Sequence, residues 1–190
     1  FLAMQYPSEV SGVVNAEFLK AAINSKRETP IKLFEFYRQL ESASKKVNIP
    51  MEMANRFLNE GFSGGEKNRN EILQLLLLKP DFAMLDEIDS GLDVDAINVV
   101  ANAIKELEQT DMSFLVVSHY ARLYQLIHPT RAVIMINGRI ALDGDTSLIK
   151  RIDEEGYEWI KKEYGIEINK EEAVMNTVSI GSCAVKQVIK

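Results

Sequence analysis

The stretch DFAMLDEIDSGLDVDAINVVANAIKELEQTDMSFLVVSH, residues 81–119, sets the expected fold class. Two short apolar runs, 81–85 and 112–117, have the length and composition of buried parallel strands. Between them, apolar side chains recur every three or four residues, which predicts an amphipathic helix. The positions are Ala96, Val99, Val100, Ala103, Ile104 and Leu107. A strand, a helix and a second strand in this order predict an α/β fold with a parallel sheet covered by helices.

Polar side chains follow both predicted strands at their carboxyl ends. Asp86 and Glu87 come directly after the first run, and His119 lies two residues past the second. Ligands of open α/β sheets bind beyond these strand ends, so the three side chains are candidates for a functional site. Each also has an ordinary explanation, because acidic pairs and single histidines are common at strand ends.

The chemistry of these residue types fits a reaction at phosphate. Mg²⁺ is commonly bound by one or two carboxylates together with phosphate oxygens, which suits Asp86. A neighbouring carboxylate such as Glu87 can orient or deprotonate an attacking water. The imidazole of His119 can hydrogen-bond that water and a terminal phosphate, provided that the two strands are neighbours in the sheet.

A second candidate phosphate site lies in GFSGGEKNRNE, residues 61–71, where Gly64 and Gly65 precede a predicted helix over 66–78. The N–H groups at the start of a helix point outward, and the helix dipole favours an anion there. Glycine also allows a close approach of the backbone. The phosphate loop of nucleotide hydrolases, G-x-x-x-x-G-K-[ST], occurs nowhere in the 190 residues.

Two further stretches indicate little when taken alone. In SGLD, residues 90–93, Ser90 or Asp93 can cap the following helix and Gly91 can permit a turn, so a structural role is favoured. Gln5 in LAMQYP precedes a Tyr-Pro turn and is unremarkable by itself.

Composition restricts the class of protein. With 46% hydrophobic and 26% charged residues, the chain has the composition of a soluble globular protein. The net charge of −6 argues against sequence-independent binding to nucleic acid or anionic lipid. No apolar run approaches the roughly 20 residues that span a bilayer, so we expect no direct membrane insertion. The single cysteine, Cys183, fits a reducing compartment, and we expect a cytoplasmic protein with an inert surface thiol.

The chain divides into three predicted regions. Residues 1–78 contain three predicted helices, over 15–27, 31–47 and 51–60, and then the helix over 66–78. Residues 79–150 contain the α/β core and a closing hairpin, which Asn137-Gly138 between two apolar runs predicts. Residues 151–190 form a C-terminal segment, in which a helix begun at 146 continues to 165 and the last 20 residues show no period.

Read together and in order, these stretches resemble a known family. Gln5, SGGE at 63–66, an apolar run ending in DE at 86–87, SGLD at 90–93 and SH at 118–119 are similar to the ordered motif set of the ATP-binding-cassette (ABC) ATPases. GFSGGEKNRNEILQ and LDEIDSGLDVDA most resemble the SufC family, the ATPases of the Suf iron–sulfur cluster assembly system. Transporter cassettes usually have LSGGQ and DEPTSALD instead.

The resemblance, which spans residues 1 to about 168, implies a role for each matching residue. Gln5 matches the glutamine that contacts Mg²⁺ and the attacking water, and Asp86 matches the Walker B carboxylate that holds Mg²⁺. Glu87 matches the catalytic base and His119 the switch histidine. The remaining matches are Asp93, as the D-loop aspartate, and the signature loop of Ser63, Gly64, Gly65 and Glu66.

The resemblance also implies the ligands and partners. ATP with Mg²⁺ would lie between two cassettes arranged head to tail, and the implied partners are a second copy and the SufB and SufD scaffold proteins. The chain starts at Phe1 without Met, inside an apolar stretch. We therefore expect an ABC core whose N-terminal part, with the Walker A loop, is missing, so that the 190 residues alone are inactive.

Two alternatives stay open. One is a nucleotide-binding subunit of an ABC transporter, with the same catalysis and a transmembrane partner. The other is a non-catalytic cassette that acts as a dimerisation or regulatory module.

Overall fold

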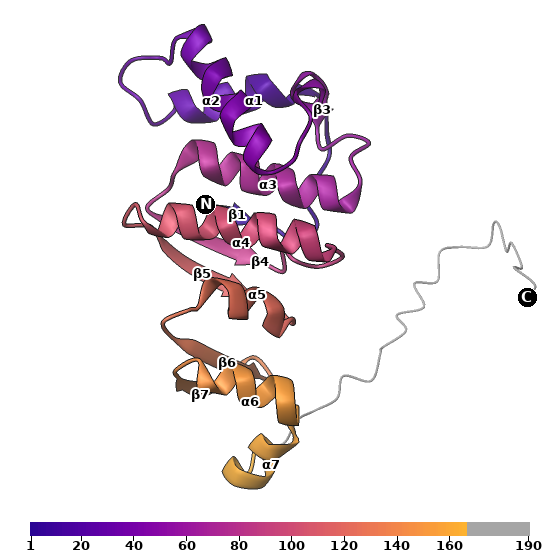
Figure 1. Ribbon diagram of the computed structural model, residues 1–190, viewed down its shortest axis with the longest axis vertical. Coiled ribbons are helices and arrows are strands. Elements are labelled where there is room, and N and C mark those ends of the chain that lie inside the picture. Colours follow the sequence, from indigo (N-terminus) through magenta and orange to yellow (C-terminus); the bar gives the residue numbers. More distant parts are fainter. Residues whose placement is uncertain (167–190) are drawn as a thin grey trace, which may run out of the picture.

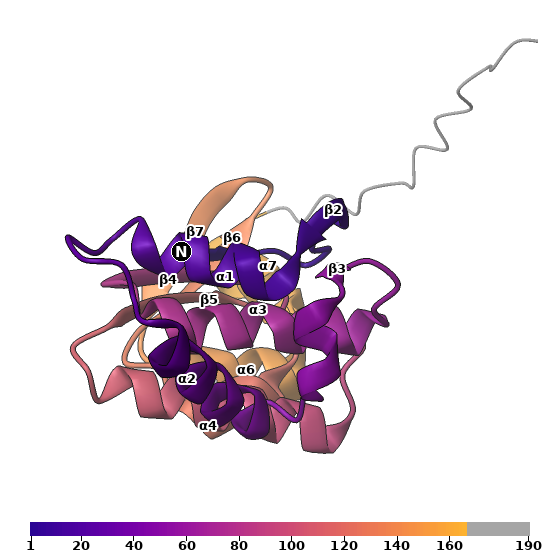
Figure 2. The same cartoon turned by 90° about the horizontal axis from the view of Figure 1, so that it is seen from above.

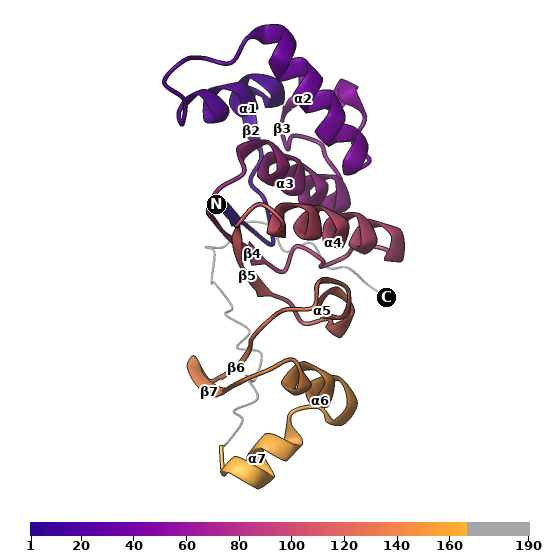
Figure 3. The same ribbon diagram turned by 60° about the vertical axis from the view of Figure 1, so that its left-hand side comes forward.

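The computed structural model describes residues 1–166, in which helices cover one side of a short parallel sheet (Figure 1, Figure 3). The elements in chain order are β1 (Leu2–Ala3), β2 (Val10–Val14), α1 (Asn15–Asn24), α2 (Leu33–Lys46), the 3₁₀ helix η1 (Met51–Asn55), β3 (Phe57–Leu58), α3 (Gly64–Leu78), β4 (Phe82–Asp86), α4 (Val94–Glu108), β5 (Ser113–Val117), α5 (Ala121–Ile127), β6 (Ala132–Ile136), β7 (Arg139–Gly144), α6 (Ser147–Glu155) and α7 (Glu158–Tyr164).

The central sheet has the strand order β1-β4-β5, and its strands are parallel. β4 and β5 pair along their whole length, which sets Asp86 opposite Val117. α4 connects these two strands and buries its apolar stripe, including Val100, Ala101 and Leu107. The predicted strand–helix–strand unit and the α/β class with a parallel sheet are therefore confirmed.

The two faces of this sheet differ. α4 and α5 lie on one side of it (Figure 3). The other face carries exposed apolar side chains, because alternate residues of a strand point to opposite faces. These side chains are Leu2, Phe82, Met84, Leu115 and Val117. Asp86 follows the same alternation, so its exposed side chain belongs to this open face.

α1 and α2 lie over α3, at the end of the molecule away from the β6–β7 hairpin (Figure 1). They confirm two of the three helices predicted before residue 60. The third prediction, a helix over 51–60, is wrong, because the segment forms η1 and then β3. β3 pairs antiparallel with β2, and Asn59 has a φ of 59°, so the chain leaves the helical region there. Pairing with a distant strand has overridden the local pattern.

The last described elements form a smaller unit. β6 and β7 are an antiparallel pair joined at Asn137-Gly138, as the sequence predicts. The helix predicted over 146–165 is interrupted at Gly156, whose φ of 68° ends α6 before α7 begins. Trp159 is buried against the hairpin. The predictions for Cys183 and for residues 170–190 lie outside the described residues.

No helix within residues 1–166 has the length and apolarity that a bilayer crossing requires.

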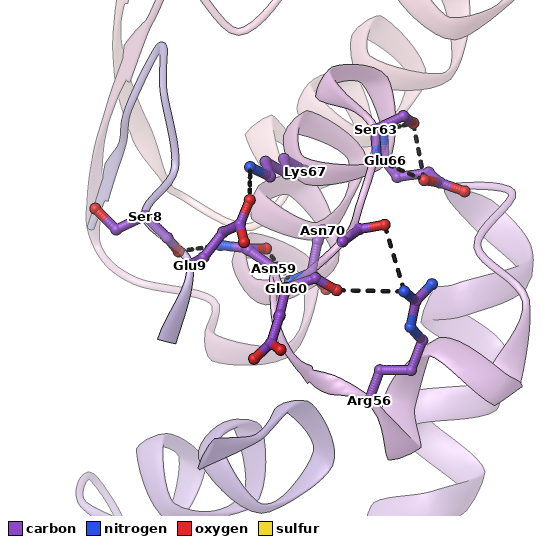
Figure 4. A network of polar contacts seen from close by, with 10 residues as sticks. Ser8, Glu9, Arg56, Asn59, Glu60, Ser63, Glu66, Lys67 and Asn70 are labelled. Carbon is purple, nitrogen blue, oxygen red and sulfur yellow. Dashed lines mark hydrogen bonds and ion pairs between the residues drawn. The ribbon is translucent and has the colours of Figure 1, made fainter. Parts of the chain in front are cut away.

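A buried ladder of asparagines connects the N-terminal segment to α3 (Figure 4). Asn15 donates to Asn70 at 3.0 Å, Asn70 donates to Asn59 at 2.9 Å, and Asn59 donates to the backbone oxygen of Ser8 at 2.9 Å. The three amides are at most 3% exposed. Buried polar groups that lose a partner cost about 1–3 kcal/mol each, so this ladder ties α1, α3 and the segment before β2 together.

We predict that Asn70→Ala lowers the free energy of unfolding by about 2–4 kcal/mol, because both neighbouring amides lose a partner without access to water. Chemical denaturation of the two proteins measures the difference. Asn102→Ala is the matched control, since Asn102 is exposed on α4 and its loss should change stability by less than about 0.5 kcal/mol. Equal effects of the two substitutions would contradict the role of the ladder.

Candidate functional site

Three of the predicted site residues meet at the carboxyl ends of β4 and β5. The Glu87 Oε1 atom lies 2.6 Å from His119 Nε2, and Gln5 Nε2 donates a hydrogen bond to the other carboxylate oxygen. Gln5 reaches this point because β1 runs parallel to β4 and ends two residues before it. The Glu87 side chain is only 19% exposed, whereas His119 is 71% exposed. The structure therefore brings one acid between an amide and an imidazole at the edge of the sheet.

The backbone of Glu87 is strained. Its φ is 47°, in the left-handed region that non-glycine residues seldom adopt. The conformation is held by a hydrogen bond of 2.9 Å from Glu87 N to the oxygen of Val117, which continues the β4–β5 ladder. Such strain costs on the order of 1–3 kcal/mol and is concentrated at functional sites. It turns the Glu87 side chain toward Gln5 and His119.

Asp86 is the candidate magnesium ligand of this site. Its carboxylate is exposed at the end of β4, next in sequence to Glu87. No group of three or more His, Cys, Asp or Glu side chains suited to a metal occurs within residues 1–166. Mg²⁺ does not need such a group, because it is often bound through one or two carboxylates, with water and substrate phosphates completing its shell. Asp86 and the Gln5 amide fit that mode of binding.

The predicted phosphate loop begins α3. Ser63 is the N-cap, and its Oγ accepts from Glu66 N at 3.3 Å while Glu66 Oε2 accepts from Ser63 N at 2.7 Å. This capping box lowers the pKa of Glu66, chiefly through the hydrogen bond from the Ser63 backbone. A Cβ added to Gly64 would meet nothing within 4 Å. Nothing within residues 1–166 therefore requires glycine at position 64.

Asp93 has the capping role that the sequence favours. Its Oδ1 accepts from Ala96 N at 2.8 Å at the start of α4. The turn before it packs against α3, where Asn68 Nδ2 donates to the oxygen of Ser90 at 3.3 Å. A Cβ built on Gly65 would lie 3.5 Å from Leu92 Cδ2, which is an ordinary contact.

The predicted site residues form two separate groups. Within residues 1–166, no hydrogen bond or ion pair joins the loop at 63–66 to the cluster of Gln5, Glu87 and His119. The loop lies at the start of α3, which packs on the far side of α4 from α5 (Figure 1). The cluster follows the carboxyl ends of β4 and β5. The predicted site residues therefore do not form one hydrogen-bonded cluster within the described part of the chain.

A second layer of residues supports the cluster and was not predicted. Asp89 is 2% exposed and accepts from Ser118 Oγ at 2.6 Å. Tyr124 Oη in turn accepts from Ser118 N at 2.8 Å. Burial raises the pKa of Asp89, and the nearby charge of Glu87 adds to this effect. Asp89 could have been noticed in the sequence, because it occupies the position where transporter cassettes have Thr. The role of Tyr124 could not, because the sequence analysis did not predict α5.

Glu71 is another unpredicted residue next to the site. It lies on α3, is 8% exposed, accepts from Gln74 Nε2 at 3.0 Å and accepts a hydrogen bond from the backbone of Met4. Met4 directly precedes Gln5, so Glu71 helps to hold the segment that delivers the amide. Burial raises the pKa of Glu71 to about 7.

This raised pKa predicts a pH dependence of stability. Glu71 binds its proton more tightly in the folded chain, so its contribution is fully present below about pH 4.5 and is lost as the pH rises through about 7. We expect Glu71→Gln to be more stable than the wild type by about 1–3 kcal/mol at pH 8.5, with the difference shrinking toward pH 5. Denaturation at several pH values measures it.

Glu108→Gln serves as the control, because Glu108 is exposed at the end of α4. It should show no such pH-dependent gain. A stability difference for Glu71→Gln that stays constant from pH 5 to 8.5 would contradict the raised pKa.

Comparison with known proteins gives close relatives, although no protein-family profile matches the chain. It is 50% identical over 169 residues to vegetative protein 296 of Bacillus subtilis, covering 88% of this chain and 65% of that protein. It is 49% identical over 173 residues to a probable ABC transporter ATP-binding protein of Streptococcus pyogenes, covering 90% and 68%. Iron-sulfur cluster assembly protein SufC of Plasmodium falciparum is 47% identical over 167 residues, covering 86% and 48%.

Solved structures support the fold. The dimeric ATP-binding cassette MJ0796, solved in a post-hydrolysis state with ADP and phosphate, superposes with a TM-score of 0.64 at 16% identity, covering 76% of this chain and 62% of that one. The ATP-binding subunit of an ABC transporter superposes with a TM-score of 0.67 at 21% identity, covering 84% and 68%. The chain thus spans about two thirds of the length of these bacterial relatives and solved structures, and about half of the length of the Plasmodium protein.

Proposed function

Because the chain belongs to the ABC ATPase family and is similar to SufC, we propose that it supplies half of an ATP-hydrolysing site that is completed by a second cassette. The observation that carries this proposal is the separation of the two groups of site residues. The loop at 63–66, at the start of a helix, and the acid cluster at Glu87 are both suited to a terminal phosphate, but no hydrogen bond or ion pair joins them within residues 1–166. Two chains arranged head to tail would bring one of each to the same nucleotide.

In the proposed reaction, Glu87 orients and deprotonates the water that attacks the terminal phosphate. Gln5 and His119 each hold one oxygen of its carboxylate, so the side chain is fixed before the substrate arrives. Its limited exposure keeps bulk water away from the charge. The exposed imidazole of His119 can also hydrogen-bond the terminal phosphate. Mg²⁺, held by Asp86 and Gln5, would neutralise charge on the phosphates.

The signature loop acts on the nucleotide of the partner. The first turn of α3 presents backbone N–H groups, and the helix dipole favours an anion at this end. Because Gly64 has open space around it, a phosphate can approach the backbone without meeting a Cβ. The 190 residues contain no G-x-x-x-x-G-K-[ST] loop, so they should bind ATP only weakly by themselves. The cassette dimer with ADP and phosphate bound has this fold, which supports the arrangement.

For the biological role we propose the Suf iron–sulfur assembly system, with the SufB and SufD proteins and a second copy of the chain as partners. Support comes from the SufC relative and from SGGE and DEIDSGLD, which differ from the usual transporter motifs. An ABC transporter subunit is the second candidate, favoured by the name of the Streptococcus relative. Affinity purification from cells distinguishes them: soluble scaffold proteins would support the first, and an integral membrane partner would overturn it.

We predict that Glu87→Gln lowers ATP turnover of the full-length protein roughly 10²–10⁴-fold, because the amide cannot accept the proton of the attacking water. Steady-state phosphate release measures the rate, and ATP binding should be retained. Glu108→Gln, which makes the same change at an exposed position, should leave turnover unchanged. Normal turnover by Glu87→Gln would show that another group is the base.

A further inference from the structure

A cavity of about 660 Å³ lies on the helical side of the molecule, away from every residue of the proposed ATP site. Its walls come from the end of α1, one face of α2, the end of α3 and the last turns of α4. α1 and α2 lie over α3 at this place (Figure 1, Figure 2). Its volume is within the range of about 300–1,000 Å³ that small-molecule sites have.

The charge of this cavity is opposite to that of the chain. Its lining includes five of the 22 Lys and Arg residues but only one of the 28 Asp and Glu residues, in a chain of net charge −6. The five cations are Lys26, Arg27, Arg38, Lys46 and Lys79, and the acid is Glu106. Three separate parts of the chain thus bring positive charge to one cavity.

Most of this charge is not neutralised within the protein. Lys46 pairs with Glu106 at 2.5 Å. In the part of the chain that the structure describes, no ion pair is made by the other four cations, although Arg27 Nε donates to the oxygen of Thr29 at 3.3 Å. Four cations that repel one another around an open cavity favour the binding of an anion.

The nearest acids on α2 are engaged elsewhere. Glu35 accepts from Gln39 Nε2 at 3.1 Å, and Glu41 pairs with Lys45 at 2.6 Å. Arg38 therefore lies between two carboxylates of its own helix without pairing to either. Its guanidinium remains available to the cavity.

Compensation of helix dipoles accounts for only part of this positive charge. Cations in the last turn of a helix offset its negative end. Lys46 lies in the last turn of α2 and Lys79 is the C-cap of α3, whereas Arg38 lies in the middle of α2. Arg38 therefore brings to the cavity a positive charge that no helix end requires.

The lining also has an apolar part. Ile23, Ala43 and Leu76 are buried, and Leu77 and Leu78 are half-buried beside them. An apolar floor with a basic rim suits a ligand that has an apolar body and a strongly charged head. The arginines favour phosphate in particular, because the guanidinium fork matches two phosphate oxygens.

We propose that this cavity binds a small organic diphosphate or polyphosphate, with its phosphates on the basic rim and its apolar body against Ile23 and the leucines of α3. Binding at this place would contact both α2 and α3, the helix that begins with the signature loop.

The test is a matched pair of probes, inorganic diphosphate and geranyl diphosphate, which share a head group and differ in the apolar tail. In calorimetric titration of the 190-residue chain at low salt, we expect both to bind and geranyl diphosphate to bind at least tenfold more tightly. Arg38→Glu combined with Lys79→Glu should weaken both probes at least tenfold. Added salt should weaken inorganic diphosphate most, because its binding is purely electrostatic.

Lys161→Glu combined with Lys162→Glu is the control, because it makes the same change of charge on the distant helix α7. It should leave both affinities within about twofold of the wild type. Absence of binding, equal affinity for the two probes, or equal losses in the two double variants would each overturn the proposal. Far-ultraviolet circular dichroism would confirm that each variant is folded.

Discussion

The parallel pairing of β4 with β5 is the constraint on which the candidate site depends. It places the residues after both strands at one edge of the sheet, so that Glu87 and His119 come within 2.6 Å although 32 positions separate them in the sequence. In the same ladder, the carbonyl oxygen of Val117 accepts a hydrogen bond from Glu87 N, which holds the Glu87 backbone at a positive φ. Without this pairing, the carboxylate would have neither its imidazole partner nor its orientation.

The segment that carries Gln5 is held by α3 and by the loop that precedes this helix. Glu71 accepts from the backbone of Met4, the asparagine ladder binds Ser8, and Lys67 pairs with Glu9 at 2.6 Å (Figure 4). All of these contacts lead to α3 or to the loop before it. The helix whose first turn forms the signature loop therefore also supports the strand segment that delivers Gln5 to Glu87. A displacement of α3 would change both groups of site residues together.

Much of the fold and part of the site follow from the sequence. The strands at 82–86 and 113–117, the helix between them and the hairpin at Asn137-Gly138 have strong local patterns, and parallel pairing then brings His119 to Glu87. β2, β3 and the ladder of asparagines could not be predicted, because they depend on contacts between distant segments that have no periodic pattern. The roles of Tyr124 and Glu71 could not be predicted either, because they depend on contacts with residues far away in the sequence. The ABC ATPase and SufC resemblance is confirmed by relatives near 50% identity, while the individual roles of the matching residues remain predictions.

Mixing two inactive variants tests most directly whether the turn at 63–66 acts on a nucleotide held by another cassette. Full-length Glu87→Gln lacks the base but keeps the loop, whereas full-length Gly65→Val has a blocked loop but keeps the base. Each should be inactive alone. If the site is shared between chains, mixed dimers contain one intact site, and phosphate release should return to a substantial fraction of the wild-type rate. If the mixture stays as inactive as its components although mixed dimers form, both groups act within one chain and the account is wrong.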